Sequence, residues 1–154
     1  MFKAVRCNNK KPTPYLRKYF HSFQLCKDDL ILDLGCGNLR NTKYMESFDF
    51  FNVLPIDKAR DYGYQVDLGS EKIPGNFCSG KAKLILCNYV MCFLNNKERV
   101  HLSKEINRVS EKGTYLMVEM YEAKLGIPYD MDMIRGMFES WDLIHQEKNR
   151  FIVK

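Results

Sequence analysis

The stretch LILDLGCGNLRNT, residues 30–42 of this 154-residue chain, decides the fold. An apolar run ends at Asp33, and Gly35 and Gly37 follow it at alternate positions. The apolar run predicts a buried strand of a parallel sheet. The glycines predict a turn whose backbone takes unusual dihedral angles and lets a ligand come close. Asp33 would then lie at the carboxyl end of a strand, the edge where open α/β sheets bind their ligands.

The glycine turn could serve either of two kinds of nucleotide ligand. A dinucleotide site uses G-x-G-x-x-G, whose third glycine lets helix and strand pack closely, but this chain has Arg40 there. The pattern D-x-G-x-G instead resembles motif I of the class I S-adenosylmethionine (SAM) methyltransferases, although Leu39 stands where that family more often has glycine. A strand and turn without any ligand is the plain alternative. The resemblance implies a SAM-binding turn formed by Asp33, Gly35, Cys36, Gly37 and Asn38, in which a bulky side chain at position 35 would fill ligand space.

Two further strand ends extend this resemblance. The run NVLPID ends at Asp57, 24 residues after Asp33, and a carboxylate at a second strand end can accept both hydrogen bonds of a ribose diol. By resemblance Asp57 would hold the SAM ribose, with Lys58 beside it. The run YQVDL would supply Asp67 for the adenine amino group and Leu68 for the ring pocket.

A fourth strand end carries the polar–aromatic step Asn88-Tyr89 after the run AKLILC. The family places its methyl acceptor at this strand end, so both residues would position the acceptor, and Asn88 would also contact SAM. Packing at the strand end is the alternative. The chain lacks the P-C-Q motif of cytosine enzymes and the N/D-P-P-Y/F motif of amino-methylating DNA enzymes, so Cys87 should be a small core residue. Glu119 and Tyr121 end the next apolar run as secondary candidates.

The alternation of apolar strands and helices predicts an α/β fold, Rossmann-like and doubly wound, with a mostly parallel seven-stranded sheet and residues 30–33 central. Only nine residues separate Asp57 from Asp67, too few for a full crossover helix. The second crossover should therefore shrink to a turn over residues 59–62, or else Val66 lies outside the sheet. A hairpin over Lys148 and Asn149 predicts a last strand that runs antiparallel between its neighbours.

Four helices are expected. Thr13 and Pro14 open the first, and its apolar stripe should cover the sheet; that stripe comprises Tyr15, Leu16, Tyr19, Phe20 and Phe23. The other expected helices cover residues 41–48, 96–109 and 130–140. Asn96 would cap the longest of them and Gly113 would end it.

The composition indicates which class of protein the chain belongs to. With 45% apolar residues the chain can bury one core. It has no apolar run of about 18 residues and no signal sequence, which predicts a cytoplasmic protein without a membrane segment. Its six cysteines form no C-x-x-C pair and its three histidines are isolated, which predicts reduced thiols and no metal site.

We expect residues 1–27 to form a basic arm with the leading helix, and residues 28–154 to form the SAM-binding domain. The arm carries seven Lys or Arg and no acid, which leaves 5 − 7 = −2 for the rest. Such an arm could attract the phosphates of a nucleic acid, with Lys10 and Lys11 most exposed; a solvated helix face is the plainer interpretation.

The resemblance implies a SAM-dependent methyltransferase. The family builds acceptor specificity in insertions or appended domains, and this chain has almost none, which leaves small and macromolecular acceptors open; we expect a small-molecule acceptor first. The alternatives are a nucleic-acid or protein methyltransferase, an enzyme whose site is completed by a partner subunit, and a non-catalytic SAM-binding regulatory subunit.

Overall fold

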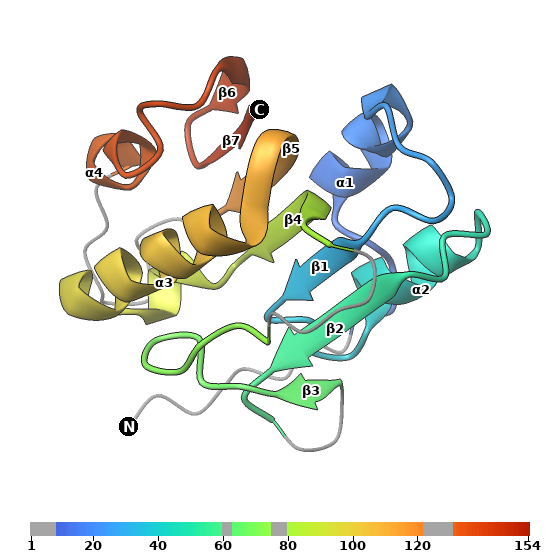
Figure 1. The fold of residues 1–154 in the computed structure, drawn as a ribbon, viewed down its shortest axis with the longest axis horizontal. Helices are drawn as coiled ribbons and strands as arrows, with labels where there is room; N and C mark the ends of the chain where they lie inside the picture. The colour runs from blue at the N-terminus through green and yellow to red at the C-terminus, as the bar shows by residue number, and fades with distance from the viewer. Residues whose placement is uncertain (1–8, 60–62, 75–79, 122–130) are drawn as a thin grey trace.

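The computed structural model describes residues 9–59, 63–74, 80–121 and 131–154, and a seven-stranded sheet runs through it (Figure 1). The strands are β1 (Ile31–Leu34), β2 (Val53–Asp57), β3 (Tyr64–Gln65), β4 (Ala82–Asn88), β5 (Ser110–Glu119), β6 (Leu143–Glu147) and β7 (Arg150–Val153). Their order across the sheet is β3-β2-β1-β4-β5-β7-β6. Strand β7 is antiparallel to both of its neighbours, and the other pairs are parallel. The predicted sheet and its antiparallel C-terminal strand are confirmed.

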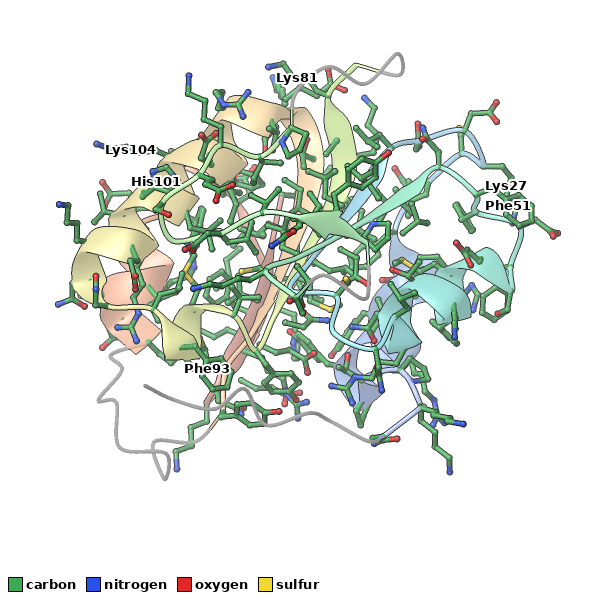
Figure 2. The ribbon with its side chains drawn as sticks, turned by 90° about the horizontal axis from the view of Figure 1, so that it is seen from below. Lys27, Phe51, Lys81, Phe93, His101 and Lys104 are labelled. Carbon is green, nitrogen blue, oxygen red and sulfur yellow. The ribbon has the colours of Figure 1, made fainter. Side chains whose placement is uncertain are left out.

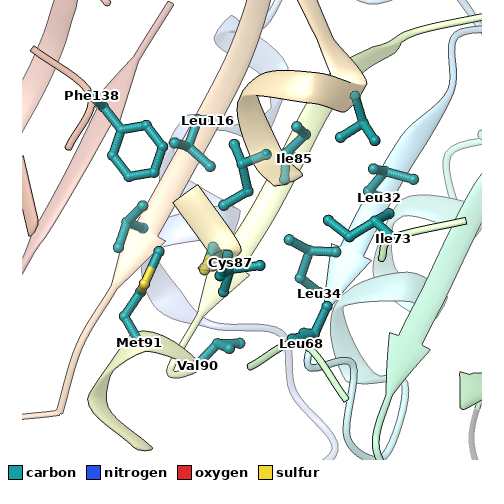
Figure 3. Packing of buried hydrophobic residues seen from close by; sticks show 14 of the residues in the cluster. Leu32, Leu34, Leu68, Ile73, Ile85, Cys87, Val90, Met91, Leu116 and Phe138 are labelled. Carbon is teal, nitrogen blue, oxygen red and sulfur yellow. The ribbon is translucent and has the colours of Figure 1, made fainter. Parts of the chain in front are cut away.

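Helices cover both faces of the sheet, as a doubly wound fold requires. They are α1 (Pro14–Tyr19), α2 (Arg40–Glu46), α3 (Asn96–Val109) and α4 (Met131–Gly136), with short 3-10 turns η1 (Phe20–Ser22) and η2 (Met91–Phe93). Figure 1 shows α1 and α2 on one side of the sheet and α3 and α4 on the other. Each side has its own apolar core, and Figure 3 shows part of the core under α3, where Leu32, Ile85 and Leu116 come from neighbouring strands.

Helix α1 begins as its sequence predicts. The Thr13 hydroxyl accepts a hydrogen bond from the Leu16 backbone N–H at 3.3 Å, and a proline follows the cap at the first helical position. The expected apolar stripe packs on the sheet: Tyr15, Leu16, Phe20 and Phe23 are buried, and Tyr19 is half-buried beside them. The aromatic rings of this segment are therefore core residues.

The boundary of α3 differs from the prediction by one residue. Its cap is Asn95, whose side chain accepts the Glu98 N–H at 3.0 Å while the Glu98 carboxylate accepts the Asn95 N–H at 2.8 Å. This reciprocal capping box fixes the start of the helix. Gly113 does not end the helix either; β5 starts directly after Val109, and Gly113 lies inside the strand with φ +94°.

The second crossover is short, as predicted. Only residues 58–63 connect β2 to β3, and part of the predicted turn, residues 60–62, lies outside the described segments. Strand β3 has two residues, and the Val66 N–H that follows it still donates to the Asp57 carbonyl at 2.9 Å. The short connection thus keeps the residue after β3 in register with the end of β2.

Within the described residues, no helix is both long enough and apolar enough to cross a bilayer. The four described cysteines form no disulfide; they are Cys26, Cys36, Cys87 and Cys92, while Cys7 and Cys78 lie outside the described segments. Cys87 is fully buried in the core under α3, and burial raises the pKa of its thiol to about 12. It is a packing residue, as predicted.

Candidate functional site

The strand register brings three polar side chains to one edge and one face of the sheet. Asp33 pairs with Leu86 of β4, and Asn88, two residues further along β4, pairs with Glu119 of β5. Side chains alternate along a strand, and Leu86 points into the core under α1 and α2. Asp33, Asn88 and Glu119 therefore face the same helices, and all three are at least 93% buried.

The glycine turn after β1 is tied to the end of β2. The N–H groups of Gly35 and Cys36 both donate to the Ile56 carbonyl, at 2.7 and 3.0 Å. The next N–H, that of Gly37, donates to Asp57 Oδ2 at 2.8 Å. The turn therefore has a fixed shape, and one carboxylate from β2 helps to hold it.

Leu39 closes the turn in the conformation that a glycine would favour. Its φ is +66°, in the left-handed region, where it precedes the first residue of α2. For a residue with a side chain, this conformation costs about 1–2 kcal/mol. Leu39 therefore holds a conformation that a glycine would adopt without this cost.

The two glycines of the motif have different roles. A Cβ on Gly35 would lie 2.5 Å from Cγ2 of Val90, so the close approach at this position comes from the loop after β4. The expectation that a side chain at position 35 would fill ligand space is therefore corrected: it would strike protein atoms. A Cβ on Gly37, by contrast, would meet no atom within 4 Å. Open space beside the turn lies at position 37.

Asp33 is a buried carboxylate under the turn. Its Oδ2 accepts a hydrogen bond from the Thr42 hydroxyl of α2 at 2.6 Å. Burial raises the pKa of Asp33 to about 6, and the Thr42 hydrogen bonds oppose this shift only in part. The sequence did not single out Thr42, because its role depends on how α2 packs over β1.

The raised pKa of Asp33 predicts a pH-dependent stability. In the unfolded chain this carboxyl ionises near its ordinary pKa of 3.8, but in the folded chain it ionises only near 6. The free energy of unfolding should therefore fall as pH rises from 4 to 6, by up to about 3 kcal/mol, and stay lower above that. The variant Asp33→Asn should not show this decrease in the free energy of unfolding between pH 4 and pH 6. Urea unfolding from pH 4 to pH 7.5 measures the difference between variant and wild type.

The exposed Asp28 provides the control for this experiment. Asp28→Asn should leave the pH dependence of stability as it is in the wild type, because water screens an exposed carboxylate. A constant difference in stability between Asp33→Asn and the wild type over this pH range would contradict the assignment.

Asp57 ends β2, and Asp67 follows β3 by two residues. Asp57 also accepts the Ala59 N–H at 2.9 Å, and Lys58 Nζ lies 3.5 Å from Asp67 Oδ2. Partial burial raises the pKa of Asp67, but the Gly69 N–H and Lys58 lower it more, so its net pKa is below the ordinary value. Leu68 is buried in the core under α3. Lys58, the residue after Asp57, therefore lies beside Asp67, while Leu68 packs in the core.

Asn88 ends β4 with both polar atoms of its side chain buried and without a hydrogen-bond partner among the described residues. Native proteins leave few such groups unpaired. Tyr89 follows it with φ +60°, and its N–H donates to the Glu119 carbonyl at 2.7 Å. Strained backbone and unpaired polar atoms at one strand end are typical of a ligand site.

Glu119 is a more prominent member of the site than the sequence suggested. Its side chain is 1% exposed, with Arg150 Nη1 at 3.6 Å and the Tyr89 hydroxyl at 3.5 Å from Oε1. Burial raises the pKa of Glu119, while Thr13, Arg150 and Arg40 offset only part of the effect. Sequence reasoning missed Arg150, because only the β5–β7 register places it beside Glu119.

The leading segment borders this edge. The Asn9 carbonyl accepts a hydrogen bond from Asn38 Nδ2 at 3.0 Å, and the Thr13 N–H donates to Asn41 Oδ1 at 3.0 Å. Lys10 and Lys11 are exposed beside it. Residues 1–8 of the predicted basic arm lie outside the described segments. Among the described residues, no group of three or more His, Cys, Asp or Glu side chains is arranged to hold a metal ion.

Comparison with known proteins identifies the fold. No family model matches the sequence, and no curated protein matches it. Solved structures do: a TehB-like SAM-dependent methyltransferase from Corynebacterium glutamicum is 20% identical, with TM-score 0.67, over 88% of this chain and 83% of that one. TehB from Haemophilus influenzae is 14% identical, with TM-score 0.72, over 96% of this chain and 63% of that one.

The glycopeptide N-methyltransferase MtfA, solved with SAM, is 12% identical, with TM-score 0.62, over 96% of this chain and 87% of that one. These similarities show that the chain has the fold of the class I SAM-dependent methyltransferases, as the D-x-G-x-G motif indicated.

Proposed function

We propose that this protein is a SAM-dependent methyltransferase that acts on a small molecule. The observation that carries the proposal is the buried amide of Asn88, unpaired among the described residues, at the edge that also bears the glycine turn and Asp57. Burying an unpaired amide costs about 1–3 kcal/mol. A ligand that pairs with the amide would explain why the chain keeps it, and in this fold that edge is where ligands bind.

The residues present fit SAM. Asp57 would accept hydrogen bonds from the ribose diol, because each of its oxygens already accepts one N–H and retains a second lone pair. Lys58 would lie beside the ribose, Asp67 would accept the adenine amino group, and Leu68 would line the ring pocket. The open space at Gly37 would hold the amino-acid end of SAM, beside Cys36, Asn38 and the buried Asp33.

The chemistry asks little of the protein beyond alignment. SAM supplies a methyl group already activated by its sulfonium, so the chain must hold the acceptor in line with it and exclude water. Asn88 and Tyr89, at the carboxyl end of β4, would position the acceptor. MtfA is named for methylation of a glycopeptide, and the described part of the chain adds no extra layer to the fold, which supports a small acceptor.

Calorimetric titration with SAM tests this proposal. The wild type should bind SAM and its demethylated product and should not bind NADH. Asp57→Ala removes the two proposed ribose hydrogen bonds and the acceptor for the Gly37 N–H, so its SAM affinity should fall by about 1–3 kcal/mol.

Asp29 provides a matched control, because its carboxylate also accepts a backbone N–H, that of Cys26 at 2.7 Å, in the turn before β1. Asp29→Ala should bind SAM as the wild type does. Equal SAM affinity in Asp57→Ala and the wild type would show that the ribose assignment is wrong. Binding of NADH in place of SAM would refute the whole proposal.

A further inference from the structure

Four strands contribute to a continuous row of polar residues at the carboxyl edge of the parallel strands. The register pairs Asn88 of β4 with Glu119 of β5, Glu119 with Arg150 of β7, and Arg150 with Glu147 of β6. The row therefore runs from the proposed SAM site across the sheet toward β6. Glu119 occupies its middle and is its most deeply buried carboxylate.

Glu119 is incompletely neutralised. The nearest cation, Arg150, directs its Nε to Glu147 at 2.6 Å and reaches Glu119 only through Nη1 at 3.6 Å. A charge-assisted N–H···O hydrogen bond is about 2.7–2.9 Å long, so this contact is weak. Oε2 of Glu119 is buried and no hydrogen bond of ordinary geometry reaches it among the described residues, although the Thr13 hydroxyl and the Arg40 guanidinium are close enough to lower the pKa of the carboxyl in part. A hydrogen-bond donor or a cation that enters the site would therefore stabilise this buried, incompletely paired carboxylate.

Aromatic rings lie next to this carboxylate. Tyr89, whose hydroxyl faces Glu119, stacks on Tyr121 with ring centroids 4.4 Å apart and planes at 24°. Phe93 meets Tyr121 edge-on at 5.9 Å and is 40% exposed. Figure 2 shows Phe93 at the opposite end of the molecule from Lys81, which precedes β4, so the rings mark the carboxyl edge of the sheet.

A carboxylate beside aromatic faces is the combination that recognises an ammonium group or an amine. An alcohol could donate a hydrogen bond to one carboxylate oxygen but would leave the negative charge of Glu119 unbalanced. An anionic acid would be repelled by that charge. We propose that the acceptor is a small aromatic or ring-bearing amine, and that Glu119 is the catalytic residue that binds its nitrogen and takes its proton. This inference rests on the proposed function.

The bound ammonium first gives one proton to the Glu119 carboxylate, which passes it to water, and the nitrogen is left as a neutral amine. The amine nitrogen then attacks the methyl carbon, a C–N bond forms, and the C–S bond breaks with its electron pair left on sulfur, which gives the neutral thioether. The methylated product leaves as an ammonium ion, so the transfer releases one proton for each methyl group. The raised pKa of Glu119 suits a group that must accept a proton and release it again.

Benzylamine is the probe for this site, with benzyl alcohol and benzoate as neutral and anionic analogues of the same shape. Binding to the wild-type chain, measured by ligand-observed NMR with the demethylated product of SAM present, should favour benzylamine by about tenfold or more. Glu119→Gln should abolish that preference and keep SAM affinity within about twofold. Glu105→Gln, a buried acid on α3, is the matched control and should keep the preference.

Two further measurements keep the test decisive if Glu119→Gln folds poorly. In the wild type, benzylamine affinity should fall as the pH is lowered and Glu119 takes up a proton, while benzyl alcohol affinity stays flat. With saturating SAM, mass spectrometry should detect N-methylbenzylamine, formed about tenfold or more slowly by Glu119→Gln at unchanged KM for SAM.

The proposal is overturned if the wild type shows no preference for benzylamine, if the preference survives in Glu119→Gln, or if the wild type forms no N-methylbenzylamine. A chain that binds SAM without preferring the amine would refute this inference and leave the proposed function standing. A chain that prefers the amine but does not bind SAM would refute the proposed function, and with it the transfer step.

Discussion

Gly37→Leu is expected to abolish SAM binding and leave the fold intact. A side chain at this position meets no protein atom within 4 Å, so it would project into the space that we assign to the ligand. The loss of affinity should exceed about 4 kcal/mol, or three orders of magnitude in Kd. The free energy of unfolding should fall by only about 1–2 kcal/mol, since φ at Gly37 is +50° and leucine is strained there. Calorimetry with SAM and urea unfolding measure the two effects.

Gly113 provides a control for backbone strain. It also has a positive φ, and a Cβ added to it would meet no atom within 4 Å, but it lies near the start of β5, at the opposite edge of the sheet. Gly113→Leu should lose a similar amount of stability and keep its SAM affinity. If Gly37→Leu binds SAM as tightly as Gly113→Leu does, the ligand does not occupy the space beside the turn.

Asn88→Leu is expected to stabilise the free protein and remove its response to SAM. Leucine has a similar volume and leaves no unpaired polar atom, so the free energy of unfolding should rise by about 1–3 kcal/mol. A ligand at 100 times its Kd stabilises a protein by about 2.7 kcal/mol, and the variant should gain none of this. In urea unfolding, SAM should therefore raise the free energy of unfolding of the wild type and leave that of the variant unchanged.

Asn41 is the matched control for this substitution. It is as buried as Asn88, but its Oδ1 accepts the Thr13 N–H, so Asn41→Leu leaves that donor unpaired and should destabilise the free protein by about 1–3 kcal/mol. Opposite signs for the two substitutions are the expected result. A loss of stability in Asn88→Leu would mean that its amide is paired in the folded chain, and would remove the main support for the ligand site.

Local sequence patterns predicted the elements of this fold well, because each depends on neighbouring residues. Residues 150–153 form a strand as predicted, and Thr13 caps α1. The errors also have local causes. Asn95 and Asn96 could each cap α3. Asn95 is the cap because Glu98, three residues after it, completes a capping box with it. Gly113 follows α3 closely, as a glycine that ends a helix would. Its positive φ instead belongs to the irregular part of β5.

The site was predicted only in part, because its members depend on packing between distant segments. Asp33, Asp57 and Asn88 were candidates because each ends an apolar run. The contact between Val90 and Gly35 could not be read from the sequence, since it joins the loops after β1 and β4. Arg150 reaches Glu119 only through the register of two strands, and no periodicity within either strand reveals that register.

The position of β7 has a consequence for how the chain acquires its structure during synthesis. The strand that lies between β5 and β6 is formed by residues 150–153, the last of the seven to leave the ribosome. Until then the nascent chain can pair β3, β2, β1, β4 and β5, but one side of β5 stays unpaired and available to other strands. Glu119 also lacks Arg150 during that interval. Completion of the sheet and assembly of the polar row therefore coincide, because both wait for the synthesis of β7.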